Sequence, residues 1–260
     1  MRNLILTLLL LLLPVSVSAQ DKAMERIVKN GEINCGVYAL GSIFSYDTSG
    51  KPKGFTVDLM NEISMRTGLK VKYTEISSFA TLGLDMNSAK FDMICAPVLF
   101  FPPTSMKFLP SLYLGKDEIN IYADASLDIT KIKTVEDLND PKHIFVGMDG
   151  ELGGLYAPKM FPKAKLSMLP LGTPPAQMFM DLQTKKAHFM MLTRLAANAF
   201  LRENPGKLKM VLETAIVKPS VRLFYPVDSN ALKANMDAIL EEMQHDGTLD
   251  KLLKKHDLVF

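Results

Sequence analysis

The sequence predicts an α/β protein of two similar lobes, each built on a doubly wound sheet. Three observations indicate this fold class. Strand-like and helix-like segments alternate along residues 31–260, which favours parallel sheets over a β-sandwich. The alternation starts again after residue 128, and a late strand carries the chain back toward the first unit. Two α/β lobes joined by two crossings imply a cleft between them.

The first 19 residues predict a cleavable secretory signal peptide. Arg2 lies near the start, an unbroken apolar run covers residues 8–13, and small residues fill positions 17–19. The run is short for a membrane span, although an uncleaved anchor is the alternative. No cysteine follows the cleavage position, so lipid attachment there is not expected. We therefore leave residues 1–19 out of the fold.

The charge balance argues against nucleic acid as a partner. The chain has 30 Lys and Arg against 28 Asp and Glu, a net charge of +2, and removal of Arg2 with the signal peptide brings it nearer to zero. Binding of nucleic acid needs a basic face that displaces counterions. The length suits one large domain or two small ones, each with enough apolar residues for a core.

The two cysteines and four histidines carry no clear site. Cys35 and Cys95 both lie in predicted strands, and in an exported chain they form either a disulfide or two buried thiols. The histidines show no metal-ligand spacing: they are His143, His188, His245 and His256. We expect no metal and no cofactor.

The stretch 31–63 predicts the first strand, loop and helix of lobe 1. Apolar residues alternate over 33–37, as in a buried strand, and a loop with Phe44 follows. A turn at 48–52 leads to a helix that ends at Gly68. In open α/β sheets the loop after the carboxyl end of a strand usually holds the ligand, so this loop is a candidate binding segment.

The remaining elements follow in order. Lobe 1 continues with a strand, a short helix and two strands, at 70–76, 78–88, 91–99 and 119–123. Lobe 2 contains a short helix capped by Thr134, strands at 143–148, 166–169 and 189–192, and helices at about 150–160 and 174–185. A strand at 221–225 returns to lobe 1, and two amphipathic helices end the chain. We assign residues 20–123 and 222–260 to lobe 1 and residues 124–221 to lobe 2.

Five segments together resemble one known family. They are GVYALGSIFSY, GKPKGFTVDLMNEI, AKFDMICAPV, KTVEDLNDPKHIFVGMDGE and DGTLDKLLKKH. Their order and spacing resemble the family 3 periplasmic solute-binding proteins, the amino-acid-binding type of ABC importer component, over about residues 27–256. The resemblance implies a type II periplasmic binding protein fold, a periplasmic location, a monomer, a small-molecule solute and an inner-membrane ABC permease as partners.

The ligand positions of the family are altered in lobe 1. In polar amino-acid binders of the family, an arginine binds the ligand carboxylate through two parallel hydrogen bonds from its guanidinium group. The corresponding residue here is Thr104, so this pair of donors is absent. The Ser and Thr positions at the end of the third strand correspond to Ala96, Pro97 and Leu99. Aromatic positions are kept: they are Tyr38, Phe44 and Phe79.

Lobe 2 is altered as well. The Gly-Thr that receives a carboxylate at a helix N-terminus is Gly150-Glu151 here, followed by Leu152. The aspartate that holds the ligand ammonium group corresponds to Thr193, next to Arg194. A zwitterion buried without paired charges costs several kcal/mol. The sequence therefore predicts that no ordinary α-amino acid binds by the family's usual geometry.

Several alternatives stay open. Lys107 or Arg194 could supply a displaced positive charge, and Glu151 could meet a cation or only cap its own helix. Phe44 and Phe79 could be core residues. Three function classes remain: a solute-binding protein of an ABC importer, a dehydratase-like enzyme with Glu151 as acid, and a non-transporting sensor or partner protein that has lost ligand binding.

Overall fold

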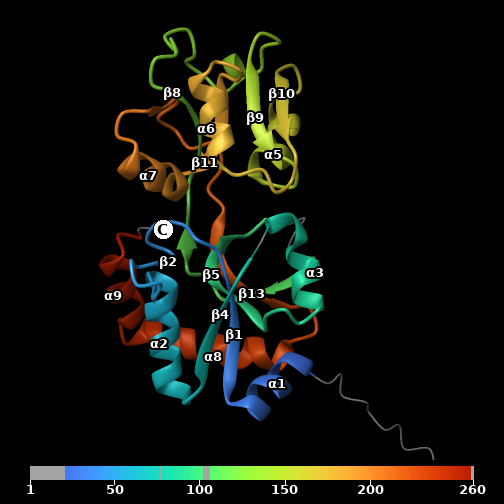
Figure 1. Ribbon diagram of the computed structural model, residues 1–260, viewed down its shortest axis with the longest axis vertical. Helices are drawn as coiled ribbons and strands as arrows, with labels where there is room; N and C mark the ends of the chain where they lie inside the picture. The colour runs from blue at the N-terminus through green and yellow to red at the C-terminus, as the bar shows by residue number, and fades with distance from the viewer. Residues whose placement is uncertain (1–20, 77, 102–105, 259–260) are drawn as a thin grey trace, which may run out of the picture.

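The chain folds into two α/β lobes, one above the other, and two segments cross between them (Figure 1). This computed structural model describes residues 21–76, 78–101 and 106–258. The predicted signal peptide and Thr104 lie outside the described residues. Each lobe has one large sheet with helices packed against it, so the predicted two-lobe α/β organisation is confirmed.

The sheet of lobe 1 has the order β4-β1-β5-β13-β6, and β7 also pairs with β13. Its strands are β1 (Glu32–Val37), β4 (Lys70–Glu75), β5 (Met93–Leu99), β6 (Phe108–Pro110), β7 (Gly115–Lys116) and β13 (Ser220–Pro226). Strands β4, β1 and β5 run parallel, but β13 runs antiparallel to its neighbours. The predicted parallel pairing holds for β4, β1 and β5 but not for β13, because the returning strand enters from the second lobe in the opposite direction.

The helices of lobe 1 are α1 (Lys22–Asn30), α2 (Phe55–Thr67), α3 (Leu82–Asn87), α8 (Asn230–His245) and α9 (Thr248–Lys255), with a 3₁₀ turn η1 (Phe79–Thr81) and a small hairpin of β2 (Ser45–Tyr46) and β3 (Pro52–Lys53). Helix α2 ends where predicted, at Gly68, whose φ of 75° suits a residue without Cβ. Helix α1 is not predicted by the sequence pattern, and it begins at Asp21, whose side chain accepts a hydrogen bond from the Met24 amide.

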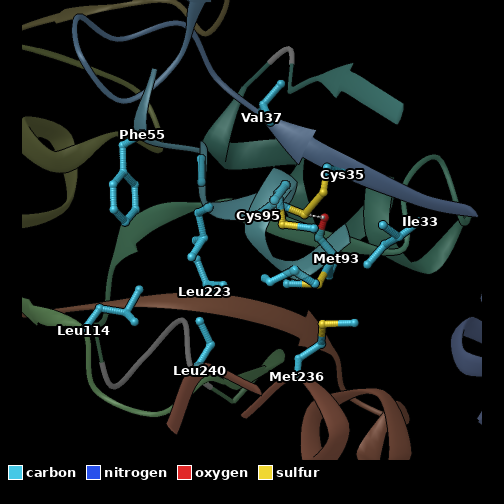
Figure 2. Close-up of a cluster of buried hydrophobic side chains, with 14 of the residues drawn as sticks. Ile33, Cys35, Val37, Phe55, Met93, Cys95, Leu114, Leu223, Met236 and Leu240 are labelled. Atoms are coloured by element: carbon cyan, nitrogen blue, oxygen red, sulfur yellow. Dashed lines mark hydrogen bonds between the residues drawn. A yellow bond between two sulfur atoms is a disulfide. The ribbon is translucent and has the colours of Figure 1, made fainter. Parts of the chain in front are cut away.

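The core of lobe 1 contains a disulfide between Cys35 and Cys95 (Figure 2). These residues lie on the neighbouring strands β1 and β5, with Cα atoms 5.3 Å apart, and both are fully buried. Leu223 and Met93 lie in the same cluster. The disulfide settles the alternative that the sequence left open, and a disulfide is typical of an oxidising compartment.

The sheet of lobe 2 has the order β10-β9-β11-β8-β12. Its strands are β8 (Ile119–Asp124), β9 (Ile144–Met148), β10 (Lys165–Leu169), β11 (Phe189–Thr193) and β12 (Leu208–Met210). Strands β10, β9 and β11 are parallel, whereas β8 is antiparallel to β11 and β12. Each lobe therefore has a mixed sheet, with its antiparallel strand at the crossing.

The helices of lobe 2 are α5 (Leu152–Met160), α6 (Ala176–Gln183) and α7 (Arg194–Glu203), with a 3₁₀ turn η2 (Glu136–Leu138). The predicted helix at 134–138 is this single turn. Thr134 does not precede it as N-cap; the carboxylate of Asp137 instead accepts hydrogen bonds from the Lys133 and Thr134 amides. The sequence pattern does not predict helix α7, although Thr193 caps it by accepting a hydrogen bond from the Ala196 amide.

The two crossings lie side by side and are hydrogen-bonded to each other. The Asp117 amide donates to the Pro219 carbonyl at 3.1 Å, and the Ile119 amide donates to the Val217 carbonyl at 2.9 Å. Because β8 belongs to the second sheet, the predicted boundary between residues 123 and 124 is wrong, and the boundary between 221 and 222 falls inside β13. The first crossing is extended chain that runs directly from β7 toward β8.

Candidate functional site

A cavity of about 510 Å³ lies between the lobes and next to the first crossing. In lobe 1 it is lined by residues at the carboxyl ends of β1, β4 and β5, and in lobe 2 by residues at the ends of β9 and β11. The beginnings of α5, α6 and α7 also face it. This is the position at which open α/β sheets bind ligands, and the volume is that of a small-molecule site.

Seven predicted site residues line this cavity, and they come from both lobes. They are Tyr38, Phe79, Pro97, Leu99, Glu151, Leu152 and Thr193. Most of the surface around them is apolar, with Leu82, Met148 and Met178 among the lining residues. No Lys, Arg or His is found among the described residues that line it.

Phe44 and Ala96 do not line the cavity, and their assignment to the ligand site is wrong. Phe44 is fully buried in the core of lobe 1, where its ring lies 5.4 Å from that of Tyr73. Ala96 is also fully buried, because its position on β5 directs it into the same core. The sequence pattern marks both as apolar but does not tell which side of the strand ends they occupy.

Arg194 and Lys107 do not supply a displaced positive charge to the cavity lining. Arg194 begins α7, and its guanidinium lies 3.4 Å from the Glu118 carboxylate. Lys218 forms a second ion pair with Glu118 at 2.9 Å. Lys107 is exposed, and neither Lys107 nor Arg194 is among the lining residues.

Tyr38 is a structural part of the cavity wall, and its hydroxyl does not ionise near neutral pH. Its hydroxyl donates a hydrogen bond to the Pro97 carbonyl, and its ring meets that of Phe79 edge-on at 5.0 Å. Burial and the nearby Asp117 carboxylate raise the pKa of Tyr38 well above its ordinary value. Tyr38 therefore stays protonated and holds the loop after β1 to the end of β5.

Glu151 points across the cavity instead of capping its own helix. It occupies the N-cap position of α5, but its side chain makes no capping hydrogen bond. Burial raises the pKa of Glu151, and a hydrogen bond from the Phe79 backbone, in the opposite lobe, acts in the other direction. The alternative that Glu151 only caps α5 is wrong, because the carboxylate engages lobe 1.

Asp117 is a cavity residue that the sequence did not predict. It lies in the first crossing, lines the cavity and is 5% exposed. Burial raises the pKa of Asp117, although hydrogen bonds with the Glu118 backbone, Thr193 and the Leu195 backbone, and the charge of Arg194, all act to lower it. The sequence signal was the polar run at 116–118, which marks the true crossing.

Asp117→Asn should remove part of the pH dependence of stability. A carboxyl with a raised pKa in the folded state stabilises the fold most when protonated, and this contribution is lost as pH rises from the unfolded value through the folded one. The unfolding free energy of the wild type, relative to the variant, should therefore fall as the pH rises above the unfolded value of about 4. Urea unfolding at several pH values checks this, and a relative rise with pH would contradict it. Glu118 and Arg194 must stay unchanged in the variant, because both act on the pKa of Asp117.

The cavity wall is mostly apolar and contains two carboxylates, those of Asp117 and Glu151. Within the described ranges no group of three or more His, Cys, Asp or Glu side chains is placed to hold a metal ion. In the same ranges no helix is both long and apolar enough to cross a membrane.

The sequence of residues 33–258 matches the family described as bacterial extracellular solute-binding proteins, family 3. The chain belongs to this family. A similar protein is the probable amino-acid ABC transporter-binding protein of Haemophilus influenzae, which is 23% identical over 97% of this chain and 96% of its own length.

Solved structures of similar proteins show the same fold. An arginine-binding protein from T. maritima is 22% identical, with a TM-score of 0.76 over 90% of this chain and 98% of its own. The ancestral amino acid-binding protein AncCDT-1, a precursor of cyclohexadienyl dehydratase, is 22% identical, with a TM-score of 0.75 over 89% and 97%. This family 3 protein thus has the type II periplasmic binding protein fold, as predicted. At this identity the likeness speaks for the fold alone.

Proposed function

We propose that this protein captures a small solute in the cavity between its lobes and delivers it to an inner-membrane ABC permease. The observation that carries the proposal is the cavity itself, which lies beside the first crossing and is lined by residues of both lobes. Membership of a solute-binding family and a relative named as an ABC transporter-binding protein support it. Closure of two lobes about such crossings is a common way to enclose a ligand.

We further propose that the solute is not an α-amino acid held in the family's usual way. An α-amino acid brings a carboxylate and an ammonium group, and each needs a partner when it leaves water. The described lining offers carboxylates but no cationic side chain. Thr193 stands at the position expected for the ammonium-binding aspartate, and its hydroxyl oxygen already accepts the Ala196 amide.

Two other roles have less support. Glu151 has the raised pKa that a general acid needs, and AncCDT-1 is a precursor of a dehydratase. However, the second cavity carboxylate, Asp117, is held by the start of α7, and the described residues around the cavity include no set of nucleophile, base and orienting residue. A non-transporting sensor or partner protein that has lost ligand binding would have no use for the cavity between the lobes.

The test is binding by the intact exported protein. Mass spectrometry under native conditions, on protein purified from its own cells, should show a bound small molecule that denaturation releases. Readdition of the released compound at one hundred times its dissociation constant should stabilise the emptied protein by about 2.7 kcal/mol. Calorimetry with the standard amino acids should give no micromolar affinity. A protein that co-purifies empty and responds to no solute contradicts solute capture.

A requirement for the permease separates transport from sensing. Cells that lack the adjacent or cognate permease should lose uptake of the released compound, while the purified protein keeps its affinity. Retained uptake would contradict delivery to an ABC importer.

A further inference from the structure

We propose that the solute is an organic cation with an apolar body and no carboxylate, whose positive group is held at Glu151. This inference rests on the proposed function and adds the chemical class of the solute. It combines three features of the cavity: carboxylates of the chain itself stand at the starts of α5 and α7, Glu151 retains acceptor capacity, and most of the remaining wall is apolar.

The first step concerns the helix N-termini that face the cavity, which are usual sites for a ligand carboxylate. At α5 the position before the helix is Glu151, so a negative side chain already stands there. At α7, Asp117 accepts hydrogen bonds from Thr193 and the Leu195 backbone. At α6 the entering residues Pro174 and Pro175 have no N–H to donate. A second carboxylate, brought by a ligand, would therefore meet the fixed negative charge of Glu151 at α5 and of Asp117 at α7.

The second step concerns the acceptor capacity of Glu151. A carboxylate has about four acceptor positions, and the hydrogen bond from the Phe79 backbone occupies one of them. Its own helix takes none of the others. A cationic N–H group arriving in the cavity would supply charge-assisted hydrogen bonds, which are about twice as strong as neutral ones. Burial, which disfavours the carboxylate alone, would then strengthen the pair because the local dielectric is low.

The third step concerns the body of the solute. Phe79 lies beside Glu151 across the cleft, and Tyr38 meets the ring of Phe79 edge-on. A cation near such rings is attracted by their electron-rich faces. Leu82, Met148 and Met178 line other parts of the wall. The volume of about 510 Å³ leaves room for one ring or a branched alkyl group.

The experiment uses probes that share a body and differ in charge. 2-Phenylethylamine, 2-phenylethanol, 3-phenylpropionate and L-phenylalanine present the same ring as a cation, a neutral group, an anion and a zwitterion; cyclohexyl and 3-methylbutyl analogues widen the series. Calorimetry on the full exported protein at pH 7 should show an amine binding at least tenfold more tightly than the alcohol of the same body. The acids and amino acids should show no measurable heat of binding.

Glu151→Gln should remove this preference, because the amide keeps the shape but not the charge. We expect amine affinity to fall at least tenfold and alcohol affinity to stay within threefold. Glu203→Gln, which changes an exposed carboxylate at the end of α7, is the matched control and should change neither. If alcohols, acids or amino acids bind as tightly as the amines, the inferred class is wrong while solute capture stands. If no probe and no co-purified compound binds, solute capture itself fails, and the inference with it.

Discussion

Replacing Cys35 and Cys95 together with alanine is expected to lower the free energy of unfolding by about 4 kcal/mol, the loop-closure contribution for a disulfide that spans 60 residues. For a chain of this size that corresponds to a fall in Tm of about 10 °C. The two cysteines join β1 to β5. Of the cavity residues, Tyr38 directly follows β1 and Pro97 lies near the end of β5. Urea unfolding and calorimetry measure the change.

Reduction provides the control for this experiment. With a strong reductant present, the wild type should unfold close to the double variant, since both then lack the covalent link. Alanine is the replacement of choice because both positions are fully buried and a serine hydroxyl would have to be satisfied there. A loss of less than about 1 kcal/mol would show that the unfolded chain gains little freedom when the link is absent.

Gly154→Ala is expected to destabilise the protein by about 2 kcal/mol and to weaken solute binding. A Cβ at this position would lie 2.5 Å from the Met148 carbonyl oxygen, which belongs to the backbone of β9. The preceding residue is also close to this strand, since a Cβ on Gly153 would lie 3.2 Å from the Gly147 Cα. Helix α5 would therefore move away from β9 and carry Glu151 with it. Thermal unfolding and solute titration measure the two effects.

Gly83→Ala is the matched control. Gly83 also lies inside a helix, α3, but a Cβ there would meet only the Phe108 ring, at an ordinary 3.8 Å. Because alanine is the better helix former, this variant should gain up to about 1 kcal/mol. If Gly154→Ala proved as harmless as Gly83→Ala, the close contact of α5 with β9 would not be what fixes the position of Glu151.

The sequence predicts the strands with central positions in the sheets more accurately than the crossings. Strands β1, β5 and β9 are largely buried, so their apolar character is clear in the sequence. The first crossing was misplaced because extended chain continues from β7 into β8 without a loop, whereas the polar stretch at 124–128 only follows the end of β8. A polar composition indicates a loop, but this crossing is extended chain without a loop.

The two unpredicted helices differ in the strength of their patterns. Helix α1 is amphipathic, with its buried residues Ala23 and Ile27 four positions apart on one face, but it has only nine residues, so the pattern covers little more than two turns. Helix α7 has apolar residues on several sides, because Leu195 packs against the core of lobe 1 while Ala196 and Phe200 pack within lobe 2. A helix with two partners has no single apolar face, so its helical period is hidden.

The sequence predicts lining residues of the cavity where the family pattern assigns a position, as at Phe79 and Glu151, and misses them where tertiary structure supplies the residue. Asp117 has no counterpart in that pattern, and it reaches the cavity because the crossing passes beside the start of α7. Phe44 was misassigned because an aromatic residue in a loop can face either the core or the cleft. In the same way, nothing in the sequence tells that Glu151 turns away from its own helix.

The hydrogen-bonded pairing of the two crossings has a consequence for motion. Two separate tethers would let the lobes slide, twist and swing independently, but a paired ribbon resists sliding because Asp117 and Ile119 would lose their partners on the other strand. Two hydrogen-bonded strands bend far more readily out of the plane that contains them than within that plane. Opening and closing should thus follow a single angular coordinate, so one pair of fluorophores, with one on each lobe, would report the whole movement.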